Sequence, residues 1–173
     1  QPNVAEAKER TGKILALMID KQFKADVPIL ETDAYSLFST KKIAHLTDFL
    51  ASAPKYFSIM AYLGKAIDDE VKLLRQVISL KTGRPVTFGW GPRFLHSTGQ
   101  LHKGGQMNGA FIQITAEIME DLEIPGSGYK FSQLIMAQAL GDGAALAERN
   151  LPVVRIHLKN TKTGISKLLT DLN

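Results

Sequence analysis

A strand pattern runs straight into a polar loop in the stretch Val86-Thr87-Phe88-Gly89-Trp90-Gly91-Pro92-Arg93-Phe94-Leu95-His96-Ser97-Thr98-Gly99-Gln100-Leu101-His102-Lys103-Gly104-Gly105. Its last fifteen residues hold two histidines, two cations, two hydroxyls, a glutamine and four glycines, which is not the composition of a core element. Glycines let a backbone approach a ligand, and His, Lys, Arg, Ser and Thr hold phosphate or move protons. We therefore expect residues 91–105 to form a binding loop for an anionic small molecule.

Outward from this stretch, apolar runs alternate with amphipathic segments. Strands are predicted at residues 56–63, 86–90, 110–116 and 152–158, and helices at residues 3–23, 42–51, 68–81 and 131–148, with a short helix after residue 163. Residues 24–40 break the periodicity and are interpreted as a linker or arm, and Gly141-Asp142-Gly143 is expected to break or cap its helix. The alternation predicts an α/β fold, a three-layer sandwich with a largely parallel sheet. In such sheets ligands bind beyond the carboxyl ends of the strands, where the polar loop begins.

Length and composition bound the function. The 173 residues form one helical segment and linker arm (residues 1–55) and one α/β domain (residues 56–173) in this interpretation. The absence of Cys excludes disulfides, thiolate catalysis and Cys-ligated zinc, and is compatible with a reducing cytoplasm. No apolar run approaches the roughly 18 residues of a membrane-spanning helix, and the net charge of +4 is spread along the chain, which disfavours a membrane or nucleic-acid partner.

Each candidate residue in the loop has a structural alternative. His96 suits general acid–base work, because its unperturbed pKa lies at about 6.5, and the structural alternative is a capping or core histidine. Arg93 can clamp a phosphate or face water, and Lys103, which follows His102, can contact a phosphate or be a solvated cation. No carboxylate lies near His96 and His102 in the sequence, so a metal site is not expected.

Two motifs resemble the phosphoglucose isomerase family. The segment Gln1-Pro2-Asn3-Val4-Ala5-Glu6-Ala7-Lys8 resembles the family's C-terminal signature in its Gln-to-Lys spacing, although Asn3 replaces a Gly and Glu6 falls one place late. The segment His96-Ser97-Thr98-Gly99-Gln100 keeps the family's His-to-Gln spacing, with the later Gly about one residue early. The His follows the Gln…Lys signature here, whereas it precedes that signature in ordinary members. Residues 91–158 look like the C-terminal part of bifunctional transaldolase/phosphoglucose isomerases.

The resemblance implies a fold and site roles. The fold would be sugar-isomerase (SIS)-like, and the site would need no cofactor or metal. Catalytic roles pass to His96, which helps to open the sugar ring, and to Lys8 near the ring oxygen. Contacts with the substrate are expected from Gln1, Arg93, Ser97, Thr98, Gln100, His102 and Lys103. The family's catalytic base, a Glu in a Glu-Ser-x-Gly-Lys-type motif, is not in this chain and would lie upstream.

The chain is therefore expected to be the C-terminal domain of a cytoplasmic glucose-6-phosphate isomerase, which interconverts glucose 6-phosphate and fructose 6-phosphate in glycolysis and gluconeogenesis. Its partners would be the sugar phosphate, upstream isomerase and transaldolase domains of a parent chain and, as an open alternative, a second copy in a homodimer. A different class of function also fits: a non-catalytic sugar-phosphate-binding or assembly module. A nucleic-acid module is a third and more distant alternative.

Overall fold

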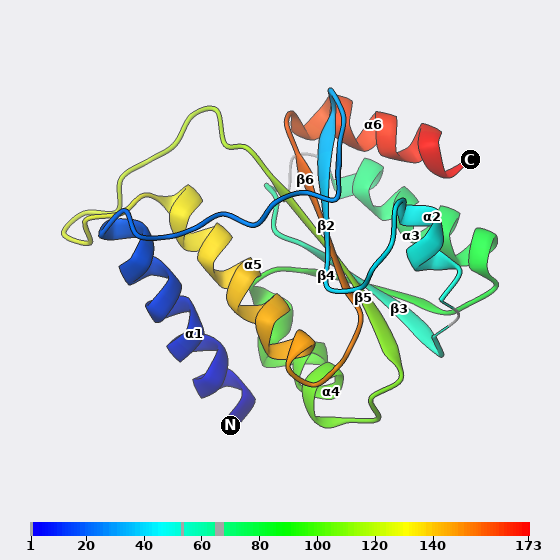
Figure 1. Cartoon of the computed structure of the whole chain (residues 1–173), viewed down its shortest axis with the longest axis horizontal. Coiled ribbons are helices and arrows are strands. Elements are labelled where there is room, and N and C mark those ends of the chain that lie inside the picture. Colours follow the sequence, from blue (N-terminus) through cyan, green and yellow to red (C-terminus); the bar gives the residue numbers. More distant parts are fainter. Residues whose placement is uncertain (1, 53, 65–67) are drawn as a thin grey trace.

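Helices and strands alternate along the chain in the computed structural model (Figure 1), which describes residues 2–52, 54–64 and 68–173; the side chains of residues 2–4, 68, 95 and 96 are not part of that description. The helices are α1 (Pro2–Ile19), α2 (Leu46–Leu50), α3 (Asp68–Thr82), the 3-10 helix η2 (Arg93–His96), α4 (Thr98–Gly104), α5 (Phe131–Ala147) and α6 (Thr161–Leu172). The strands are β1 (Leu30–Glu31), β2 (Tyr35–Ser39), β3 (Tyr56–Ala61), β4 (Val86–Trp90), β5 (Gly109–Ala116) and β6 (Val153–Leu158).

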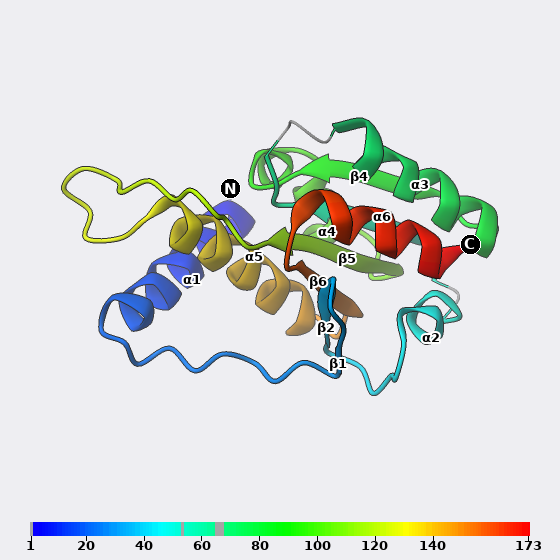
Figure 2. The ribbon, with the colours of Figure 1, turned by 90° about the horizontal axis from the view of Figure 1, so that it is seen from above.

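The described strands form one sheet of six in the order β1-β2-β6-β5-β3-β4. The four strands β6, β5, β3 and β4 are parallel, and β2 and β1 extend the sheet antiparallel at one side. Figure 2 shows the sheet between two helical layers, with α1 and α5 on one side and α3 and α6 on the other. The expected α/β fold with a mostly parallel sheet is therefore confirmed, and the arrangement is that of a three-layer sandwich.

The two faces of the sheet differ in chemistry. Alternate strand residues such as Ile59, Ile112 and Ile156 point into an apolar core that α3 and α6 cover. Their neighbours on the opposite face are in part polar and still buried, among them Ser58, Gln113 and Arg155. Because successive side chains of a strand point to opposite faces, this division is set by the period-2 pattern of each strand. The face toward α4 and α5, called the polar face below, is thus the one that carries chemistry.

Most predicted elements are confirmed, but three local interpretations are wrong. Residues 30–39 are not linker, because β2 pairs with β6 and buries Tyr35 and Leu37. The boundary at residue 55 stays a prediction, although β2 joins the same sheet as the later strands. Residues 91–105 are not an open loop throughout, because η2 and α4 lie within them. No helix in the described ranges is long and apolar enough to cross a membrane.

The third error concerns Gly141-Asp142-Gly143, which lies inside α5 and neither breaks nor caps it. A Cβ on Gly141 would come within 3.2 Å of the backbone nitrogen of Thr11, so this glycine lets α1 approach α5 closely. A Cβ on Gly143 would lie 2.8 Å from the Gln113 side-chain oxygen on β5. Close packing on both sides of α5 therefore outweighs the helix propensity that glycine lacks.

Candidate functional site

A crevice of about 260 Å³ lies at the carboxyl ends of the parallel strands. Residues 62–64 after β3, Gly91 after β4 and residues 116–118 at the end of β5 line it, together with Ile135 of α5 and Thr161 at the start of α6. The chain passes from β3 to β4 on one side and from β5 to β6 on the other, so the strand order reverses between β3 and β5. Crevices at such a reversal are the usual ligand sites of open α/β sheets. The fold thus places its candidate site where the polar segment begins.

Tyr62 forms the floor of this crevice. Its ring is buried, and a Cβ on Gly91 would lie only 2.5 Å from it, so Gly91 can come this close because it has no side chain. The Tyr62 hydroxyl donates to Oδ2 of Asp142 at 3.2 Å. Burial and the neighbouring Asp142 carboxylate both raise the pKa of Tyr62 well above its ordinary value. Tyr62 is therefore a neutral hydrogen-bond donor that is fixed in place from behind.

The first part of the predicted loop stays beside the crevice. Arg93 begins η2 two residues after Gly91, and its side chain is exposed. Ser97 and Thr98 are exposed as well, and Gln100 is half-buried. His96 ends η2, so its backbone is close in sequence to the crevice, while its side chain lies outside the described part of the chain. The structure thus keeps Arg93, His96 and Ser97 on one short segment at the carboxyl edge of β4.

The second part of the predicted loop turns inward. Lys103 is 4% exposed and forms an ion pair with Asp142, which is 1% exposed. The ammonium is therefore enclosed between α4 and α5 and does not reach a ligand in solvent, contrary to the expected phosphate contact. Burial raises the pKa of Asp142, while Lys103 and Tyr62 act in the opposite direction. The ion pair lies directly behind the crevice, because Tyr62 lines the crevice and its hydroxyl hydrogen-bonds Asp142 of the pair.

His102 is likewise a buried residue and not a surface ligand. Its Nδ1 lies 2.9 Å from the Tyr56 hydroxyl and its Nε2 3.0 Å from the Ser58 hydroxyl, so both ring nitrogens have partners on β3. Burial, with help from the charge of Lys103, lowers the pKa of His102 to about 4. The imidazole is therefore neutral at neutral pH and joins α4 to the sheet. The expectation of a substrate contact is not supported at this position.

The N-terminal motif lies on a different element. Lys8 is exposed on α1, which packs along α5 and also touches α4. Gln1 lies outside the described residues. On the same helix, Glu6 pairs with Arg149 at 2.7 Å and with Arg10 at 2.9 Å, and these contacts lower the pKa of Glu6 to about 2. The Glu6–Arg149 pair attaches α1 to the body of the fold, on the polar face, whereas the Glu6–Arg10 pair lies within α1.

Sequence reasoning missed three residues at or behind the crevice: Tyr62, Asp142 and Glu117. Glu117 directly follows β5 and is the carboxylate among the described lining residues. The rule that ligands bind beyond strand ends could have singled out Glu117, which follows the predicted strand at 110–116, and Tyr62, which lies at the end of the predicted strand at 56–63. Asp142 carried only the misleading signal of its two flanking glycines. No group of three or more His, Asp or Glu side chains in the described ranges could hold a metal.

Comparisons with known proteins bear on the fold alone. No protein-family model matches the chain, and no curated protein matches it. Among solved structures, a hypothetical protein from Thermus thermophilus matches with a TM-score of 0.63 and 21% identity. The match covers 73% of this chain but 35% of that one, so this chain spans about a third of the length of that structure. Its α/β architecture therefore recurs as part of a larger protein.

The buried ion pair predicts strong coupling between Lys103 and Asp142. Lys103→Met leaves the Asp142 carboxylate buried without its cation, which should cost about 3–5 kcal/mol of unfolding free energy. Adding Asp142→Asn to Lys103→Met removes the unpaired charge and should restore part of that loss. Urea unfolding of the two single variants and the double variant measures this coupling. Simple additivity of the two single effects would contradict a buried pair.

The contact between Gly91 and Tyr62 predicts a contrast between two glycines of the same crevice. Gly91→Ala drives a methyl group into the Tyr62 ring and should lower stability by about 1–3 kcal/mol. Gly64→Ala is the matched control, because nothing lies within 4 Å of its Cβ position. Thermal unfolding of both variants tests this, and equal losses would show that the ring moves away freely.

The low pKa of His102 predicts a stability change with pH. The His102 imidazole is protonated near pH 6.5 in the unfolded chain but only near pH 4 in the folded chain. The stability that the neutral, buried imidazole contributes is therefore complete above pH 6.5 and is lost as the pH falls toward 4. His102→Gln removes it, so the stability difference between parent and variant should shrink over that window. Urea unfolding at several pH values measures this difference. A difference between parent and variant that stays constant from pH 6.5 to about pH 4 would contradict this prediction.

Proposed function

We propose that this chain is the C-terminal, SIS-like domain of a glucose-6-phosphate isomerase of the transaldolase-fused type. One observation supports the proposal: the polar segment that contains the family's His motif begins at Gly91, which lines the crevice where the strand order reverses. The crevice, at about 260 Å³, lies just below the roughly 300–1,000 Å³ of typical ligand pockets, so it would take a small ligand such as a monosaccharide phosphate. The site belongs in the cytoplasm in this proposal.

The residues have distinct roles in the proposed reaction. Arg93 is exposed at the start of η2 and binds the phosphate with its guanidinium. His96, at the end of η2, exchanges a proton with the ring oxygen as the sugar opens. Lys8 lies on the part of α1 whose ion pairs reach Glu148 and Arg149, at the other end of α5 from Ile135 of the crevice, so it has no role in this site. Ser97, Thr98 and Gln100 hydrogen-bond the sugar. His102 and Lys103 support this segment from the interior instead of touching the sugar.

Proton transfer between the two carbons of the aldose and the ketose needs a carboxylate base. The resemblance assigns that base to an upstream Glu, while Glu117 is the carboxylate that this crevice itself offers. The 173-residue chain should therefore bind the sugar phosphate weakly and show no turnover without its upstream domains. Isomerase activity in pure material would contradict this division of roles.

A non-catalytic binding or assembly module is the second candidate. It is favoured by the enclosure of Lys103 and His102, which leaves fewer reactive side chains at the crevice than the sequence suggested. In a longer protein that carries this unit, His96→Ala separates the two candidates. Loss of kcat with KM maintained supports catalysis, and an unchanged kcat supports the module.

The proposal predicts that the chain binds 5-phospho-arabinonate, an analogue of the enediol intermediate, at the crevice. Saturable NMR shifts should appear for the amides of Arg93, Ser97 and Glu117. Arg93→Ala should weaken binding about tenfold or more, because a charge-assisted contact to phosphate is lost. Arg75→Ala, which removes the same charge from an exposed site on α3, should leave the affinity unchanged. Equal weakening by both substitutions would contradict the proposed role of Arg93.

A further inference from the structure

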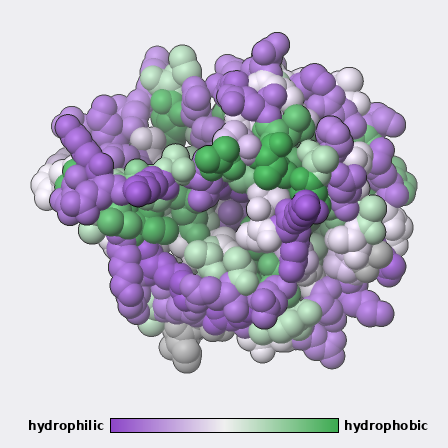
Figure 3. All heavy atoms as spheres, in the orientation of Figure 1, coloured by the Kyte–Doolittle hydropathy of each residue, from purple (hydrophilic) through white to green (hydrophobic). Residues whose placement is uncertain are grey.

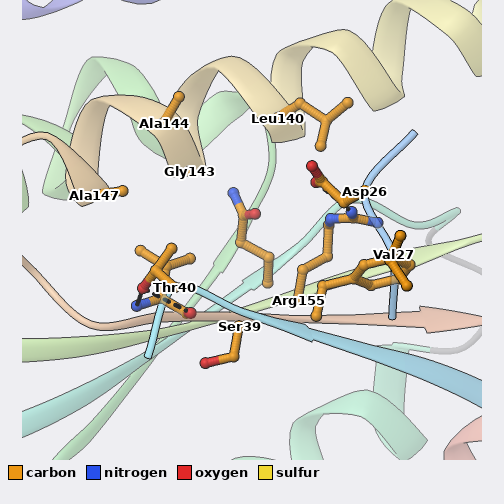
Figure 4. A pocket seen from close by; sticks show the side chains of 12 residues that line it. Asp26, Val27, Ser39, Thr40, Leu140, Gly143, Ala144, Ala147 and Arg155 are labelled. Atoms are coloured by element: carbon orange, nitrogen blue, oxygen red, sulfur yellow. Dashed lines mark hydrogen bonds and ion pairs between the residues drawn. The ribbon is translucent and has the colours of Figure 1, made fainter. Parts of the chain in front are cut away.

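A second cavity, of about 400 Å³, opens on the polar face of the sheet. It lies between α5, the strands β2 and β6, and the arm that joins α1 to β1, and the face in Figure 3 is hollowed near its centre. None of its described lining residues also lines the crevice. We call it the Arg155 cavity, after the cation on its floor (Figure 4).

Small side chains on α5 create this space. Gly143, Ala144 and Ala147 line the cavity on its α5 side (Figure 4), where longer residues would take up part of it. Gln113 of β5 forms part of the floor and is 2% exposed, and its amide nitrogen donates to the Ala139 carbonyl at 2.7 Å. The walls are thus fixed by the helix and sheet, and the cavity is large enough for a small metabolite.

Arg155 is the cation of this cavity. It is 9% exposed, and its guanidinium carbon lies 3.9 Å from the centre of the Phe38 ring, so the aromatic ring covers one of its faces. In the described part of the chain, its one hydrogen bond to a side chain runs from Nη2 to Oδ2 of Asp26, at 3.3 Å. A guanidinium has five N–H donors in a planar fork. Most of its capacity to bind an anion therefore remains unused.

The partner of Arg155 is held loosely. Asp26 belongs to the arm, outside any helix or strand, and its side chain is 66% exposed. A buried cation favours a well-matched, enclosed anion, and a single long contact to an exposed carboxylate is a poor substitute. Burial lowers the pKa of Arg155 in spite of Asp26, which also indicates that its charge is incompletely compensated.

We propose that the Arg155 cavity binds a small anionic metabolite, whose carboxylate or phosphate group replaces Asp26 on the Arg155 guanidinium. In the structure, Asp26 holds the arm against the cavity. The ligand's anionic group forms the two-pronged contact that Asp26 does not make, and Phe38 and α5 enclose the rest of it. This site is separate from the proposed isomerase site and does not depend on that function.

Because Asp26 and the ligand compete for Arg155, removing the Asp26 charge should increase the affinity for the ligand. Asp26→Asn removes the internal anion without touching the interior, so it should tighten the binding of citrate or inorganic phosphate about threefold or more. Asp33→Asn is the matched control, because it makes the same charge change at another exposed residue of the N-terminal part. Calorimetric titration of the parent and both variants with each anion measures the affinities.

NMR places the binding site. Saturable shifts should map to the amides of Phe38, Ser39 and Arg155 and should be lost in Arg155→Lys. Any phosphate shift at Arg93 should persist in that variant, which separates this site from the proposed isomerase site. Arg155→Lys should weaken the anion about tenfold or more, because the planar fork is lost, and circular dichroism checks that the variant folds. If citrate binds more tightly than phosphate, the natural ligand carries a carboxylate. If phosphate binds more tightly than citrate, the ligand is a phosphate monoester. Weaker binding by Asp26→Asn than by Asp33→Asn, or no binding of either anion at about 10 mM, overturns the proposal.

Discussion

The polar face of this fold depends on one interaction, the buried ion pair between Lys103 and Asp142. Each charge would be costly to bury alone, and each is tolerated because the other lies against it. Lys103 belongs to α4 and Asp142 to α5, so both helices must occupy their native positions on the sheet before either charge is compensated. Tyr62, directly after β3, hydrogen-bonds Asp142. The interaction therefore connects α4, α5 and the end of β3, which are far apart in the sequence.

The division of the sheet into an apolar and a polar face separates stability from function. The apolar face, under α3 and α6, buries large residues such as Phe57 and Ile156 and supplies most of the hydrophobic stabilisation. The polar face buries Ser58, Gln113 and Arg155, whose side chains need hydrogen-bond or ion-pair partners. Both cavities described above involve this face, where polar side chains can be left to meet a ligand.

Sequence patterns predicted the structural features that depend on residues close together in the chain. The strand at 86–90 and the helix near 68–82 follow from local periodicity, and the parallel sheet follows from their alternation. The carboxyl edge was also predictable, because it needs only the strand direction. The burial of Lys103 was not predictable, because the local sequence, a cation beside glycines, is the same whether the helix directs Lys103 toward solvent or toward Asp142. The Gly-Asp-Gly segment misled for the same reason, since contacts with Thr11 and Gln113 decide its conformation.

The two cavities have no described lining residue in common, but Gln113 and Tyr62 connect them, and they differ in rigidity. Gln113 lines the Arg155 cavity and also hydrogen-bonds Tyr62, the floor of the crevice. Tyr62 is fixed on three sides, by Gln113, Asp142 and the close approach of Gly91, so the crevice floor is formed before any ligand arrives. Preformed walls reduce the entropy that binding must overcome. The Arg155 cavity has an equally fixed floor, but the arm beside it is held by the exposed carboxylate of Asp26 and, next to β1, by a backbone hydrogen bond from Ile29 to Leu37. A ligand there acts on the arm, because the arm is the one wall that a few hydrogen bonds can move.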